Sequence, residues 1–144
     1  MSEDQASVAR RFERADEQLR QWEDSLRRED PSVDVAQAAG VATEIVKDLI
    51  KAYLLVLERD WEGSEELLDL WKVAVKKNPS LNTIRDNCRE LVYYANCVEM
   101  DRQDALPANA HKQAIRTARH VYLYLRSRAE EAGALEREQG VGAN

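Results

Sequence analysis

One stretch of this sequence, Val33 to Trp61, constrains the fold more than any other. It reads VDVAQAAGVATEIVKDLIKAYLLVLERDW, contains no proline, and is apolar through most of its length. Projected at 100° per residue, its apolar side chains cover roughly 200° of the circumference of a helix, whereas a surface helix needs a stripe of only about 100°. The sequence therefore predicts a central helix over 33–61 that neighbouring helices cover on most sides.

The rest of the chain predicts more helices. A third of the 144 residues are charged and glycine and proline are sparse, which is typical of helical proteins of one domain. We expect further helices over about 5–28, 64–78, 80–98 and 109–132, with Ser32 and Ser64 as caps and Gly133 as a stop. The predicted fold is an all-α, single-domain bundle (1–144) of about five mostly antiparallel helices around 33–61. Its ordered core is about 5–132, and 133–144 is expected to be a frayed tail.

The cysteines and the charged residues indicate the cellular compartment of the protein. Cys88 and Cys97 lie on one predicted helix with a rise of roughly 13.5 Å between them, too far for a disulfide, whose Cα atoms lie within about 7 Å. Six charged side chains between residues 44 and 59 exclude the central helix as a membrane span. The first residues, MSEDQASVARRFER, do not resemble a signal peptide. We expect a cytoplasmic protein with reduced thiols and no membrane partner.

The first predicted helix has a narrow apolar seam with the 4-3-4-3-4 spacing of a helix that touches one partner. The seam consists of Val8, Phe12, Ala15, Leu19, Trp22 and Leu26. Two interpretations remain open: the seam docks an outer helix on the bundle, or it is an interaction surface for a second copy or another protein's helix.

No catalytic motif is present. The chain has no glycine-rich phosphate loop, no ExxH or HExxH pair and no G-x-S-x-G elbow, and it has only two histidines. We therefore expect no metal site and no cofactor, and the sequence does not indicate an enzyme.

The fourth predicted helix carries Arg85, Arg89 and Asn96 on one flank, with Tyr93 nearby. Two arginines one turn apart beside a core can clamp a phosphate or carboxylate. The alternative is that both arginines pair with acidic residues of this or a neighbouring helix. Among the tyrosines, we expect Tyr94 and Tyr124 to be exposed.

The fifth predicted helix carries a basic stripe, defined here as Lys112, Arg116, Arg119 and Arg126, with no acidic residue between His111 and Arg128. Such a stripe suits nucleic-acid phosphates or an acidic partner. The alternative is a solvated face. A net charge of −6 argues against general affinity for nucleic acid.

The order of a capped apolar helix, a short helix, a helix bearing Arg85-Asp86 and a final Ala/Arg-rich helix resembles the HEPN superfamily over about residues 33–128. The resemblance implies a small all-α bundle, usually dimeric, of toxin–antitoxin, phage-defence and CRISPR-associated systems. The family's ribonuclease motif is an arginine, a polar residue and, after four to six intervening residues, a histidine. Arg85-Asp86 matches its start, but no histidine follows, and only three residues separate Arg116 from His120. The catalytic pair is therefore incomplete.

Three functions follow as expectations. The first is a non-enzymatic helical interaction protein that self-associates, as a dimer, or serves as a subunit or regulator of a larger defence or nucleic-acid-related complex. The second is a divergent HEPN-like ribonuclease or nucleotide-binding module that uses Arg85, Arg89 and Asn96, with His111 as a further member. The third is a nucleic-acid-binding subunit that uses the basic stripe.

Overall fold

The structure, a computed structural model, describes residues 3–61 and 63–137 and confirms an all-α bundle without strands in those residues. Its five α-helices and two short 3₁₀ helices follow one another along the chain. They are α1 (Glu3–Arg27), α2 (Val35–Val56), α3 (Leu67–Lys77), η1 (Pro79–Ile84), α4 (Arg85–Glu99), η2 (Gln103–Ala105) and α5 (Ala110–Glu131). None of the described helices is both long and apolar enough to cross a membrane.

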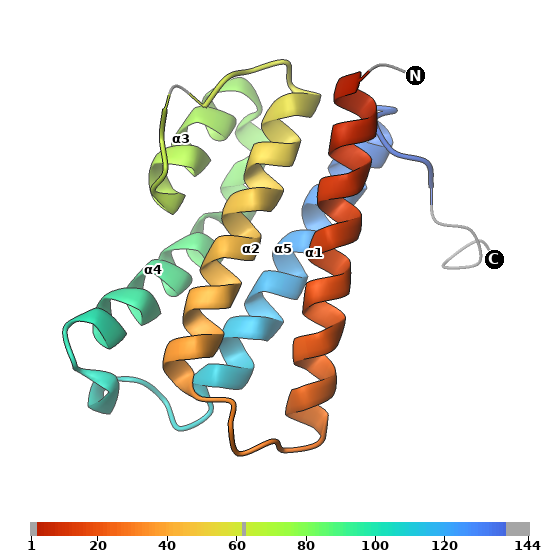
Figure 1. The fold of residues 1–144 in the computed structure, drawn as a ribbon. Helices are drawn as coiled ribbons and strands as arrows, with labels where there is room; N and C mark the ends of the chain where they lie inside the picture. Colours follow the sequence, from red (N-terminus) through yellow and green to blue (C-terminus); the bar gives the residue numbers. More distant parts are fainter. Residues whose placement is uncertain (1–2, 62, 138–144) are drawn as a thin grey trace.

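Helices α1, α2 and α5 form the main body, and α3 and α4 pack on the opposite side of α2 and α5 from α1 (Figure 1). Helix α1 runs antiparallel to α2, to which a short loop joins it. Helices α2 and α5 run in the same direction (Figure 1), and they share the most extensive contact in the bundle. The connection through α3 and α4 makes this parallel pairing possible, because a short loop allows only antiparallel neighbours.

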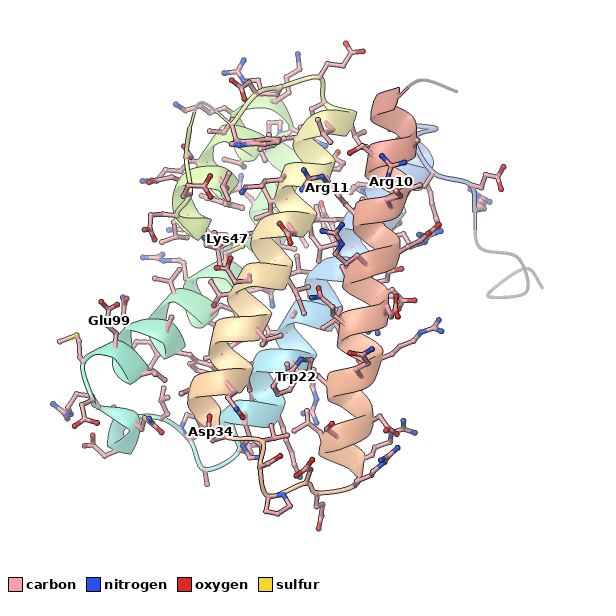
Figure 2. All side chains as sticks on the ribbon, viewed as in Figure 1. Arg10, Arg11, Trp22, Asp34, Lys47 and Glu99 are labelled. Carbon is pink, nitrogen blue, oxygen red and sulfur yellow. The ribbon has the colours of Figure 1, made fainter. Side chains whose placement is uncertain are left out.

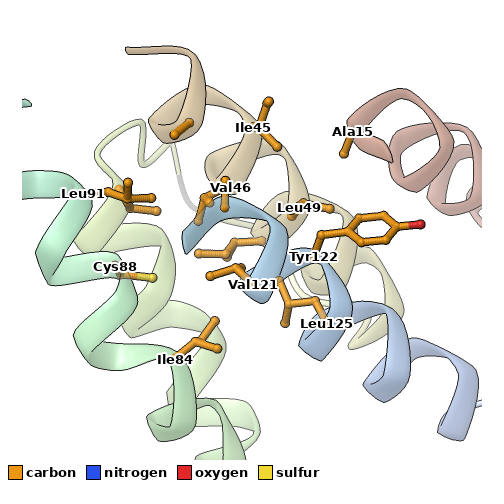
Figure 3. Packing of buried hydrophobic residues seen from close by; sticks show 14 of the residues in the cluster. Ala15, Ile45, Val46, Leu49, Ile84, Cys88, Leu91, Val121, Tyr122 and Leu125 are labelled. Atoms are coloured by element: carbon orange, nitrogen blue, oxygen red, sulfur yellow. The ribbon is translucent and has the colours of Figure 1, made fainter. Parts of the chain in front are cut away.

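The core confirms α2 as the central helix. Its buried side chains are Ala38, Ala39, Ala42, Ile45, Val46, Leu49, Ile50, Ala52, Tyr53 and Leu54. Two of them, Val46 and Leu49, lie across from Val121 and Leu125 of α5 in Figure 3. Alanines on both helices, including Ala114 and Ala118 of α5, are completely buried and let the two backbones approach closely.

The central helix is shorter than the predicted range 33–61 at both ends. Asp34, not Ser32, caps it: its carboxylate accepts a hydrogen bond from the Gln37 amide at 2.8 Å, and the Gln37 side chain bonds back to the Asp34 amide. Ser32 instead donates to Asp30 from both its amide and its hydroxyl. The helix stops at Val56 because Glu58 adopts the left-handed conformation, with φ of 55°.

The starts of two other helices differ from the prediction. Ser64 does not cap the third helix, which begins at Leu67 after Glu66 and has no side-chain cap. The fourth helix is preceded by the 3₁₀ turn η1, where the Asn78 side chain accepts from the Ser80 amide at 3.1 Å. Gly133 ends α5 as predicted, with φ of 79° and hydrogen bonds back to the last turn. Residues 138–144 of the predicted tail lie outside the described residues.

The apolar seam of α1 packs against the other helices of the same chain. Val8, Phe12 and Leu19 are at most 2% exposed and belong to the common core, and Trp22 and Leu26 pack against it. Figure 2 shows Trp22 on the side of α1 that faces the other helices. The interpretation of this seam as an interaction surface is therefore wrong, because α2 and α5 already cover it.

Alanine substitutions at two glycines, Gly40 and Gly133, should change the stability of the fold in opposite directions. Gly40 lies exposed inside α2, and a Cβ added there meets no atom within 4 Å. Gly40→Ala should therefore raise the free energy of unfolding by about 0.5–1 kcal/mol, measured by urea denaturation, because alanine loses less backbone entropy in a helix. Gly133 has the same open space but a φ of 79°. Gly133→Ala should lower stability by about 1 kcal/mol, and the same sign for both variants would contradict this explanation.

Candidate functional site

The outer face of α4 carries the side chains that stand out most from an ordinary solvated surface. Helix α4 buries Cys88, Leu91, Tyr94 and Cys97, which leaves its opposite side in solvent. On that side lie five exposed residues that we call the α4 face: Arg85, Arg89, Tyr93, Asn96 and Met100. Tyr93 is 51% exposed and Met100 is 72% exposed. The structure therefore places the predicted Arg85, Arg89 and Asn96 together on one surface.

Charges on the α4 face have no partner within the chain. Among the described residues, neither Arg85 nor Arg89 takes part in an ion pair or side-chain hydrogen bond, so the alternative of internal pairing is wrong. The other end of the helix is acidic. Glu99 points away from the bundle in Figure 2, and Asp101 follows it in the left-handed conformation, with φ of 56°.

A partly buried polar contact joins α4 to α5. The Glu90 carboxylate accepts hydrogen bonds from the Thr117 hydroxyl at 2.5 Å and from the Tyr94 hydroxyl at 3.1 Å. Burial and the bond to Glu90 raise the pKa of Tyr94 to about 12. The expectation that Tyr94 is exposed is wrong, because its ring is turned inward by this contact. Its neighbour Tyr93 takes the exposed position instead.

Tyr124, the other tyrosine expected to be exposed, is only partly so. Its hydroxyl donates to the Ser80 carbonyl at 2.7 Å, which ties α5 to the turn η1. Arg128 lies over its ring, with the guanidinium carbon 5.4 Å from the ring centre. Tyr124 is therefore a packing residue between two elements.

His111 does not join the α4 face. It lies in the first turn of α5 and lines a hollow with Pro31 and Val33 of the loop between α1 and α2. Arg85, by contrast, is the first residue of α4, which begins partway along α2, whereas α5 begins at the end of the bundle where the loop between α1 and α2 lies (Figure 1). The four residues proposed for a HEPN-like site therefore do not converge on one pocket.

Two members of the basic stripe on α5 are bound to carboxylates. Arg119 donates to Asp16 at 2.8 Å and, with two nitrogens, to Glu23 at 2.9 Å, so that it bridges α5 to α1. These bonds raise the pKa of the Arg119 guanidinium. Arg126 donates to Glu130 at 3.1 Å. The four cations therefore do not form a continuous free surface, and only Lys112 and Arg116 have no ion pair among the described residues.

The other candidates for a functional site are metal-binding side chains, the two cysteines and the exposed Leu123. In the described residues, no group of three or more His, Cys, Asp or Glu side chains lies close enough to hold a metal ion. Cys88 and Cys97 are both free and buried, and burial raises the pKa of Cys88 to about 12. Leu123 is 57% exposed on α5, but a single exposed leucine is common on soluble proteins.

Sequence reasoning missed three parts of this surface. The predicted fourth helix ended at residue 98, although Met100 continues the α4 face one turn beyond Asn96. The acidic end formed by Glu99 and Asp101 was not predicted. A helical projection carried to residue 100 places Met100 on the side of Asn96, but Asp101 has left the helix, with φ of 56°, and its position has no periodic signal. The contact of Glu90 with Thr117 joins residues 27 positions apart and has no local signal.

Because Arg119 bonds both Asp16 and Glu23, its replacement should lower stability much more than replacement of Arg20 does. Arg119→Met leaves the partly buried Glu23 carboxylate without its cation and Asp16 with only the exposed Arg20, and it should lower the free energy of unfolding by about 1–3 kcal/mol after solvent screening is allowed for. Arg20 bonds the same Asp16 at 3.1 Å, but its side chain is 74% exposed. Arg20→Met should cost less than about 0.5 kcal/mol in the same urea titration. Equal losses would show that the bridge to α1 does not stabilise the bundle.

Comparison with known proteins adds no family to these observations. No protein-family model matches this chain, and no curated protein or solved structure is detectably similar to it.

Proposed function

We propose that this protein is a non-enzymatic helical interaction protein that associates with a second copy of itself through the α4 face. One observation carries the proposal: Arg85 and Arg89 place unpaired positive charges at one end of this exposed face, and the acidic residues Glu99 and Asp101 lie at the end of α4 beyond Tyr93. Arginine, tyrosine and methionine are enriched at protein interfaces, whereas lysine and glutamate are depleted.

Two-fold symmetry makes the pattern self-complementary. Arg85 and Asp101 lie eight residues before and eight residues after Tyr93. In an isologous pair, antiparallel α4 helices that cross at Tyr93 would bring the start of each helix, with Arg85, near the acidic turn that follows the other, with Asp101. Asp86 at the edge of the basic end reduces the attraction but does not reverse it, because Arg89 adds a second positive charge.

The size of the face sets the expected affinity. Helix α4 has 15 residues, so it is about 22 Å long. One helix of this length buries less than the roughly 800 Å² per partner of a standard interface. The dimer should therefore form at micromolar concentrations, and salt should weaken it because its charges lie at the rim.

Charge-swapped variants test this dimer directly. Sedimentation equilibrium over about 5 to 500 µM should give a monomer–dimer equilibrium for the parent chain. Arg85→Glu alone and Asp101→Lys alone should each weaken self-association at least about tenfold, because both create two like-charge contacts. An equimolar mixture of the two variants should restore a dimer, since each contact then joins opposite charges.

Arg14→Glu on the exposed side of α1 is the matched control, because Arg14 is also an exposed arginine without an ion pair among the described residues. It should leave association unchanged. A parent chain that stays monomeric at all these concentrations would overturn the proposal. So would a dimer that survives both single variants, because its interface would then lie elsewhere.

The ribonuclease and nucleic-acid hypotheses have less support. The HEPN-like module needs a histidine beside Arg85, and His111 lies instead beside the loop between α1 and α2. A phosphate-binding stripe on α5 needs free cations, and two of its four are paired with carboxylates. We retain a cytoplasmic location as part of the proposal, because the two thiols of the chain are free.

A further inference from the structure

A groove between the end of α1 and the start of α5 lies apart from the α4 face. It has a volume of about 380 Å³, and Leu26, Arg27, Lys112, Ile115 and Arg116 are among its lining residues. A second hollow of about 240 Å³ also contains Leu26 and Lys112 and extends to His111. Sites for small molecules commonly have volumes of about 300–1,000 Å³, so the groove has the size of a ligand site.

Some charges in this groove are paired, and two positive charges of its lining are not; Glu29 adds one negative charge to the same lining. Arg119 and Glu23 bind each other at 2.9 Å, and Arg27 binds Asp24 at 3.1 Å. Lys112 and Arg116 have no ion pair among the described residues. They lie one turn apart on α5, where like charges repel each other by about 0.2–0.5 kcal/mol. An anion between these two side chains would remove the repulsion.

The floor of the groove is apolar. Ile115 is 1% exposed and belongs to the core, and Leu26 packs against that core from α1. The methylene stems of Lys112 and Arg116 extend this apolar surface toward solvent. An inorganic anion would leave this apolar surface exposed to water, whereas an anion with an apolar body would bury it.

We propose that the groove binds a small amphiphilic organic anion. Its carboxylate, sulfonate or phosphate group lies between Lys112 and Arg116, and its apolar body lies on Leu26 and the side-chain stems of the two cations, next to the buried Ile115. A polyanion such as RNA fits less well, because Glu29 stands on the same groove and the chain has a net charge of −6. The proposal does not depend on dimerisation, because no residue of the α4 face lines this groove.

A matched pair of fluorescent probes tests the charge requirement. Anilinonaphthalene sulfonate is an aromatic anion, and N-phenyl-1-naphthylamine is its uncharged counterpart. The first should bind the folded chain with 1:1 stoichiometry, and the second should bind at least about tenfold more weakly. Equal binding of both probes would show that the groove is only a hydrophobic surface. Displacement of the sulfonate by inorganic phosphate at equal concentration would show that the apolar floor contributes nothing.

Variants locate the site. The double variant Lys112→Gln plus Arg116→Gln should weaken sulfonate binding at least about tenfold without loss of helix content by circular dichroism. Arg10→Gln plus Arg14→Gln on the exposed side of α1 removes the same charge and should leave binding unchanged. NMR shifts of the methyl groups of Leu26 and Ile115 should follow the titration. Undiminished binding by the double variant, or shifts confined to other methyl groups, would refute the proposal.

Discussion

The close packing of α2 on α5 is the constraint on which the other contacts depend. Ala38, Ala39 and Ala42 are buried on α2, and Ala114 and Ala118 are buried on α5, so little side-chain volume separates the two backbones. Dense packing of this kind leaves few alternative positions for either helix. Because α2 and α5 run in the same direction, α3 and α4 must carry the chain back across the bundle. The outer helices α1 and α4 then dock on opposite sides of the pair, and their free faces point away from each other (Figure 1).

The distribution of charge follows from this arrangement. Arg119 lies on the side of α5 that faces α1, where it meets Asp16 and Glu23. An arginine in this position stabilises the bundle and is not available to a ligand. One turn earlier, Arg116 lies farther around the helix and has no such neighbour among the described residues. The same basic sequence pattern therefore gives one structural cation and one accessible cation. The difference depends on only a modest rotation around the helix axis.

The sequence predicted what depends on local periodicity and missed what depends on distant partners. The identity of α2 as the central helix required only its own apolar pattern. The role of Arg119 could not be predicted in this way, because Asp16 and Glu23 lie 103 and 96 residues away along the chain. Likewise, Tyr93 and Tyr94 are adjacent and chemically identical. The buried one is Tyr94, which bonds Glu90, and Glu90 in turn bonds Thr117 of α5.

The two proposed surfaces differ in how the fold supports them. The α4 face belongs to a single helix that Glu90 joins to α5 from behind, so its charges and Tyr93 keep their relative positions whether or not a partner is bound. The groove lies between two helices, and its shape depends on the bridge from Arg119 to α1. Loss of that bridge should therefore loosen the groove and leave the α4 face intact. The two proposals are therefore independent, because dimerisation through the α4 face would not require an anion in the groove, and an anion there would not require a dimer.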